Sequence, residues 1–77
     1  MKIFIVCKGN PEYHEILMPF REFEDAENYA EQQAYGSIWK RLNDFEDMCL
    51  NDGAPNIAMW YDEGALSYIS IEEWELN

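Results

Sequence analysis

A chain of 77 residues has room for one small core, which excludes two domains, so we expect residues 1–77 to fold as a single domain. Sixteen acidic residues against five basic ones give a formal net charge of -11. This charge disfavours direct binding to nucleic acid and to anionic membranes, because both depend on protein cations. The 48% hydrophobic and 16% aromatic content is atypical of a disordered chain and predicts a packed core.

The apolar run over residues 3–7 is too short for a signal sequence or a membrane span. We therefore expect a cytoplasmic protein. Cys7 and Cys49 lack CxxC spacing, and without a secretory signal we expect free buried thiols in preference to a disulfide.

A β-hairpin is predicted first. A strand is expected over residues 2–8, with apolar side chains on both of its faces, as is typical of a central strand. The turn residues Gly9-Asn10-Pro11-Glu12 follow, and a second strand is expected over residues 14–20, antiparallel to the first.

A helix is predicted over residues 24–35, with Gly36 as its C-cap. One side of it is a stripe at helical spacing, made of Ala26, Tyr29, Ala30, Gln33 and Ala34. The acidic side chains that line up away from this stripe are Glu24, Glu27 and Glu31.

A second helix is predicted from Ser37 to Leu50, ending at the Gly and Pro signals of residues 51–55. Its apolar stripe consists of Ile38, Leu42, Phe45 and Cys49.

Two more strands are expected over residues 57–61 and 66–76, joined by a tight turn with Gly64 at the position that tolerates a positive φ. The predicted order is ββααββ. This order corresponds to an α+β fold, with a four-stranded antiparallel sheet and two helices on one face.

Helices on one face leave the other face of the predicted sheet open. Apolar rings on an open face are typical of a partner or homodimer surface, unless long neighbouring side chains and the chain ends shield them. The rings expected there are Phe4, Trp60, Tyr68 and Trp74.

No pattern predicts catalysis, a metal site or a cofactor. His14 is the only histidine, and its surroundings lack HExxH or Cys/His spacing, so a surface histidine at a strand start is expected. Every serine or cysteine nucleophile would have to share His14, and no GxSxG, GxGxxG or P-loop motif is present. Glu72 and Glu73 are neighbours on a strand and point to opposite faces, so they cannot act as a pair. We therefore expect a protein that is not an enzyme.

The acidic residues are the most informative feature for function. Carboxylates one helical turn apart repeat at about 5–6 Å, which is comparable to the phosphate spacing of DNA. Such a row fits a groove lined by lysine and arginine, and it equally suits a surface that is only solvated. The residues expected to bind a basic partner are Glu24, Glu27, Glu31, Asp44, Glu46 and Asp47.

Three stretches, residues 1–6, 24–30 and 68–76, resemble short phage and bacterial proteins of uncharacterised function that open on such a strand and close on an I-E-E-x-E-L strand. In size and acidity the chain is also similar to phage-encoded anti-restriction proteins, uracil-DNA glycosylase inhibitors and anti-CRISPR proteins. This likeness implies a stoichiometric inhibitor of a basic host protein or nucleoprotein complex, such as a CRISPR effector. The alternative is a small structural module that forms a homodimer through the open sheet face.

Overall fold

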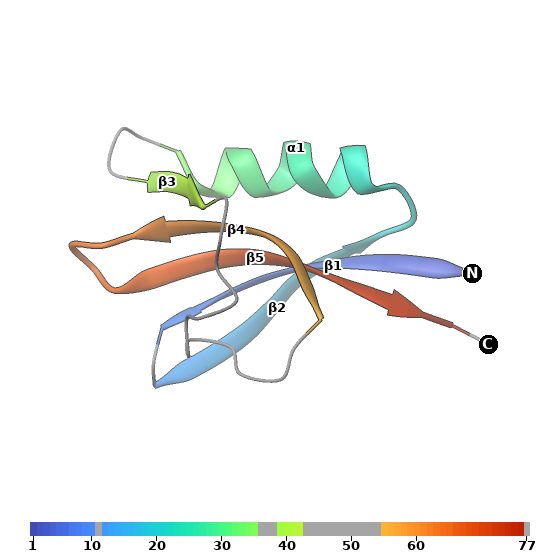
Figure 1. Cartoon of the computed structure of the whole chain (residues 1–77), viewed down its shortest axis with the longest axis horizontal. Coiled ribbons are helices and arrows are strands. Elements are labelled where there is room, and N and C mark those ends of the chain that lie inside the picture. Colours follow the sequence, from blue (N-terminus) through green and yellow to red (C-terminus); the bar gives the residue numbers. More distant parts are fainter. Residues whose placement is uncertain (11, 36–38, 43–54, 77) are drawn as a thin grey trace.

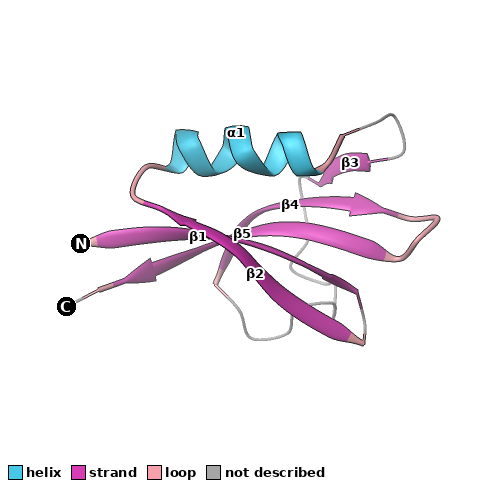
Figure 2. Cartoon of the chain, turned by 180° about the vertical axis from the view of Figure 1, so that it is seen from behind, coloured by secondary structure: helices cyan, strands magenta, loops and turns pink. Residues whose placement is uncertain are grey.

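The computed structural model describes residues 1–10, 12–35, 39–42 and 55–76. Within these ranges the strands form one antiparallel sheet in the order β2-β1-β5-β4-β3, and α1 lies along one face of it (Figures 1 and 2). The elements are β1 (Lys2–Asn10), β2 (Tyr13–Phe20), α1 (Phe23–Gln33), β3 (Trp39–Leu42), β4 (Asn56–Asp62) and β5 (Ser67–Glu75).

The predicted ββααββ order is wrong, because the described residues contain five strands and one helix. Residues 39–42, expected within a second helix, form β3 and pair with β4. Arg41 lies opposite Trp60 in this pairing, with its guanidinium carbon 5.0 Å from the centre of the indole ring. Residues 36–38 and 43–54, which include the expected cap Gly36 and the rest of the predicted helix, lie outside the described residues.

The main core lies between α1 and the sheet. Ala26 and Ala30 are fully buried, and their small side chains let the helix backbone approach the strands closely. Aromatic rings pack at the edges of this core; the ring centres of Phe4 and Phe23 are 5.8 Å apart. The buried residues of this core are Val6, Ala26, Ala30, Ala58, Trp60, Ile69 and Ile71.

The opposite face of the sheet is also buried along its central strands. Because Val6 pairs with Ile71 beneath the helix, the next pair along, Cys7 and Ser70, points to the other face. Cys7, Met59, Tyr68 and Ser70 are all at most 1% exposed. β1 is therefore an internal strand that is buried on both faces, as predicted for residues 2–8, and β5 beside it is buried on both faces as well.

The two hairpin turns are closed by side-chain hydrogen bonds to the backbone. Asn10 Oδ1 accepts from the backbone nitrogen of Glu12 at 2.8 Å, and Asp62 Oδ1 accepts from that of Gly64 at 3.1 Å. The positive φ of the second turn is at Leu66 (54°), two positions after Gly64, which itself lies outside the left-handed region. The position that needs a positive φ is therefore not the one at which the sequence places glycine.

Candidate functional site

The first candidate surface is the acidic side of α1. Glu24, Asp25 and Glu31 are exposed there, because the alanine stripe of the helix faces the sheet. We call these three residues the helix acid face. Glu24 and Glu31 are seven positions apart, which separates them by about 10 Å along the helix axis.

Glu27, predicted to belong to this acidic row, has a cation beside it. Its Oε2 lies 2.7 Å from Nη1 of Arg41, and the same guanidinium stacks on Trp60. The ion pair ties β3 to α1 and offsets the charge of Glu27. The other residues of the predicted row, Asp44, Glu46 and Asp47, lie outside the described residues.

The four rings predicted to share an open face are divided between two faces. Phe4 and Trp60 pack in the core under α1. Tyr68 lies on the other face and is fully buried, whereas Trp74, near the end of β5, is 45% exposed. The structure therefore does not bring these rings together as one apolar surface.

The second candidate is a polar cluster on the sheet face opposite α1, made of Cys7, His14, Tyr68 and Glu72. Three adjacent strands supply it: β2 supplies His14, β1 supplies Cys7, and β5 supplies Tyr68 and Glu72. Gly9 makes the convergence possible, because it pairs with His14 on one side and with Tyr68 on the other. With no side chain at Gly9, the two rings stack across it with their centres 6.0 Å apart.

Two hydrogen bonds and one contact between a ring nitrogen and a carboxylate connect the members of the polar cluster. The Tyr68 hydroxyl and His14 Nδ1 are 2.7 Å apart, and His14 Nε2 lies 3.3 Å from Glu72 Oε2. The Cys7 thiol donates to the same Oε2 at 3.5 Å, while Trp74 Nε1 donates to Glu72 Oε1 at 2.8 Å. In the neutral tautomer of His14 with its proton on Nε2, the ring accepts a hydrogen bond at Nδ1 from Tyr68 and its Nε2–H faces Glu72. The Tyr68 hydroxyl, the imidazole and the Cys7 thiol then each have a polar partner.

Burial suppresses the ionisation of two members of the polar cluster, Cys7 and Tyr68. Burial, the charge of Glu72 and the hydrogen bond to it together raise the pKa of the Cys7 thiol from 9.0 to about 12. Burial, followed by the charges of Cys7, Glu72 and Tyr13, raises the pKa of Tyr68 from 10.0 to about 12. The thiol is therefore protonated at neutral pH and is not an activated nucleophile. Cys7 is free and buried, as predicted, whereas Cys49 lies outside the described residues.

The sequence does not reveal the polar cluster. His14 was expected to be a surface histidine, and its side chain is 36% exposed, but the imidazole contacts Tyr68 and Glu72, more than fifty positions away in the chain. The available signal is Gly9 inside a strand, since a glycine in a strand often marks the close approach of another group. The partners of Gly9 follow only from the pairing of β1 with β5.

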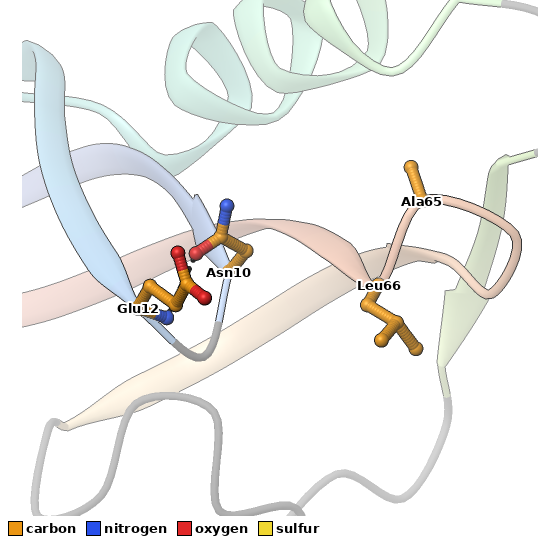
Figure 3. Close-up of a pocket in the computed structure, with 4 residues that line it drawn as sticks. All are labelled: Asn10, Glu12, Ala65 and Leu66. Atoms are coloured by element: carbon orange, nitrogen blue, oxygen red, sulfur yellow. Dashed lines mark hydrogen bonds between the residues drawn. The ribbon is translucent and has the colours of Figure 1, made fainter.

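A surface hollow lies between the two hairpin turns (Figure 3). Asn10 and Glu12 line it from the β1–β2 turn, and Ala65 and Leu66 line it from the β4–β5 turn. Asn10 Oδ1 is already used to close its own turn. The hollow therefore contributes one carboxylate and little further polar chemistry from these four residues.

No family model, enzymatic or other, matches the chain, and comparisons with curated proteins and with solved structures likewise give no significant match. In the described part of the chain, α1 is not long and apolar enough to cross a bilayer, and no other helix is present there. The case for a function therefore depends on the two candidate sites.

Proposed function

We propose that the protein is a stoichiometric, phage-type inhibitor that binds a basic, nucleic-acid-processing host protein through the helix acid face. The observation that carries this proposal is the two-sided character of α1. Its buried Ala26 and Ala30 fix the helix on the sheet, and this packing holds Glu24, Asp25 and Glu31 in solvent.

Charge supports this choice of partner. A net charge of -11 attracts a lysine- and arginine-rich surface from a distance and speeds the encounter. The helix backbone that carries these carboxylates is already ordered, so only their side chains lose conformational freedom when guanidinium groups bind them. The surface is to that extent preorganised for a groove that normally holds phosphates. In this proposal the partner is a host defence complex such as a CRISPR effector, and binding occurs in the cytoplasm.

Arg41 limits the part of the predicted acidic row that is available. Because Glu27 is engaged by Arg41, the binding residues in this proposal are the helix acid face, extended by Asp44, Glu46 and Asp47 of the original prediction. An arginine of the partner can pair with Glu27 only by displacing Arg41, so Glu27 contributes less to partner binding than the exposed carboxylates of the helix acid face do.

The test is a pull-down from bacterial lysate at low salt with the tagged protein, in the presence and absence of excess duplex DNA. We expect a nucleic-acid-processing protein to be captured and then displaced by DNA. The double variant Glu24→Lys/Glu31→Lys should abolish this capture. Its matched control is Glu15→Lys/Glu63→Lys, which makes the same change in net charge at exposed positions on β2 and in the β4–β5 turn.

The control separates a specific surface from general acidity. The helix acid face is not the binding site if the Glu24→Lys/Glu31→Lys variant still captures the partner. The same conclusion follows if the two double variants lose capture to the same extent. Circular dichroism of both variants checks that the fold is retained.

A further inference from the structure

We propose that Cys7, His14 and Glu72 form a binding site for one transition-metal dication, zinc by preference, through the atoms Sγ, Nε2 and Oε2. One ligand atom from each of the three residues lies within 4.8 Å of the other two. Thiolate, imidazole and carboxylate are the three ligand types that zinc sites in proteins use.

Two of the three distances between the ligand atoms agree with tetrahedral coordination. Zinc bonds of about 2.0–2.3 Å at tetrahedral angles place an oxygen and a nitrogen ligand about 3.4 Å apart, and an oxygen and a sulfur ligand about 3.6 Å apart. In the structure Glu72 Oε2 lies 3.3 Å from His14 Nε2 and 3.5 Å from Cys7 Sγ. The sulfur and nitrogen ligands lie within 4.8 Å of each other, against about 3.6 Å in a tetrahedral site, so an ion is held once the partly exposed His14 side chain moves toward Cys7.

Further hydrogen bonds orient two of the ligands. The Tyr68 hydroxyl lies at His14 Nδ1, the ring nitrogen that does not face the other ligands, and Trp74 Nε1 donates to Glu72 Oε1, the other carboxylate oxygen. Metal sites commonly use such contacts to fix the orientation of a ligating histidine or carboxylate. When Nε2 binds the ion, the imidazole proton is on Nδ1 and donates to the Tyr68 oxygen, so the same pair of atoms remains hydrogen-bonded.

A buried hydroxyl lies beside the sulfur ligand. Ser70 is directly opposite Cys7 in the β1–β5 pairing, is fully buried, and its Oγ has no hydrogen-bond partner among the described residues. A buried polar atom in this condition is costly. Conversion of the thiol to a metal-bound thiolate creates an acceptor next to this donor.

The ligand set favours zinc over magnesium or calcium, which prefer sites made of oxygen ligands alone. Binding exchanges the thiol proton for the metal: the S–H bond breaks, the sulfur electron pair forms the metal bond, and the proton passes to solvent. Thiolate and carboxylate then neutralise the two charges of the ion. Three protein ligands leave a fourth position for water.

This inference is independent of the proposed function, because the polar cluster lies on the sheet face opposite α1. A variant that loses metal binding should therefore still bind the partner through α1, and a variant that loses partner binding should still bind the metal.

The test is a titration of the metal-free, reduced protein with Co²⁺, followed by displacement with Zn²⁺. We expect one equivalent of Co²⁺ to bind with thiolate-to-cobalt charge-transfer absorption, and one equivalent of Zn²⁺ to abolish it. Cys7→Ser should remove this absorption. His14→Gln and Glu72→Gln should weaken Co²⁺ binding more than about 100-fold, beyond the effect usual for a residue that only supports a ligand.

Two control variants make the assignment specific. Cys49→Ser tests the other cysteine, and Glu15→Gln removes an exposed carboxylate adjacent to His14 in the chain. Both should bind Co²⁺ as the unaltered protein does. His14→Gln replaces a partly exposed side chain, so it tests the site even if the buried variants fail to fold, as circular dichroism will show. Absence of the charge-transfer absorption in the unaltered protein, its loss in Cys49→Ser, or full affinity in a folded His14→Gln variant would each overturn the proposal.

Discussion

The Tyr68 ring crosses the backbone of Gly9 so closely that a β-carbon at Gly9 would lie 2.7 Å from the Tyr68 hydroxyl oxygen and 2.4 Å from the backbone oxygen of Tyr13. The absence of a side chain at Gly9 thus leaves the space through which the Tyr68 ring passes over β1 to reach His14. Any other residue at this position must displace either the hairpin backbone or the tyrosine.

Gly9→Ala should therefore destabilise the protein by about 1–3 kcal/mol, the usual cost of overpacking a buried site. Urea unfolding followed by tryptophan fluorescence measures this change. Gly64→Ala is the matched control, because a β-carbon there meets only Asp62 Oδ1 at 3.5 Å. Equal stabilities for the two alanine variants would contradict the close packing at Gly9.

Leu66 has an unfavourable backbone conformation, with φ at 54° and its side chain 53% exposed. Leu66→Gly should stabilise the protein by about 1 kcal/mol, because glycine avoids the cost of the left-handed region and little packing is lost. Thermal or urea unfolding measures the gain. Leu66→Ala, which keeps a β-carbon, should show no such gain, and a less stable glycine variant would mean that the Leu66 side chain packs more than its exposure indicates.

The ion pair between Arg41 and Glu27 should contribute little to stability, because both side chains are partly exposed. A double-mutant cycle with Arg41→Ala and Glu27→Ala should give a coupling energy below about 1 kcal/mol that falls as salt is added. Arg41→Ala alone should strengthen binding of a basic partner, since it frees Glu27. If Arg41→Ala weakens partner binding, the proposal that Arg41 limits the acidic surface is wrong.

The metal-free protein should lose stability at alkaline pH. Folding raises the pKa of Cys7 from 9.0 to about 12 and that of Tyr68 from 10.0 to about 12, so the unfolded chain releases these protons first. Their protonated forms therefore contribute fully to folding below about pH 9, and this contribution is lost as the pH rises toward 12. Urea midpoints across this range measure the loss, and Tyr68→Phe should show a shallower decline from pH 10 upward. An identical pH profile for Tyr68→Phe would exclude a contribution from the tyrosine.

Trp74 should act on the metal site through Glu72. Trp74→Phe keeps an aromatic ring and removes the Nε1 donor that lies 2.8 Å from Glu72 Oε1. We expect zinc affinity to fall about tenfold, with stoichiometry and cobalt charge-transfer absorption unchanged. Competition with a chromophoric chelator measures the affinity. Trp60→Phe, on the opposite face, is the control and should leave zinc affinity unaltered in the folded protein.

Much of the local structure could be predicted from the sequence, because it depends on short-range patterns. A short continuous apolar run predicts β1, and the alanine stripe predicts α1 and the exposure of Glu24 and Glu31. The net charge of -11 is read directly from the sequence, and it favours a basic protein as the partner.

The tertiary structure decided what the local pattern leaves open. The segment Trp39–Leu42 fits a helical stripe through Leu42 and also fits a short strand, and its pairing with β4 selects the strand. Phe4 and Trp60 were assigned to the wrong face, because a strand with apolar residues on both sides does not reveal which side the helix covers.

The polar cluster shows the same limit for function. His14 carries no ligand motif in its own segment, and Glu72 Oε2 lies 3.3 Å from its Nε2 only because β1 pairs with both β2 and β5. The sequence by itself determined the hairpin, the helix and the acidity, since each depends on residues close together in the chain. Only the long-range pairing of β1 with β5 placed Cys7, His14 and Glu72 together, because strand register is set by the packing of the whole sheet.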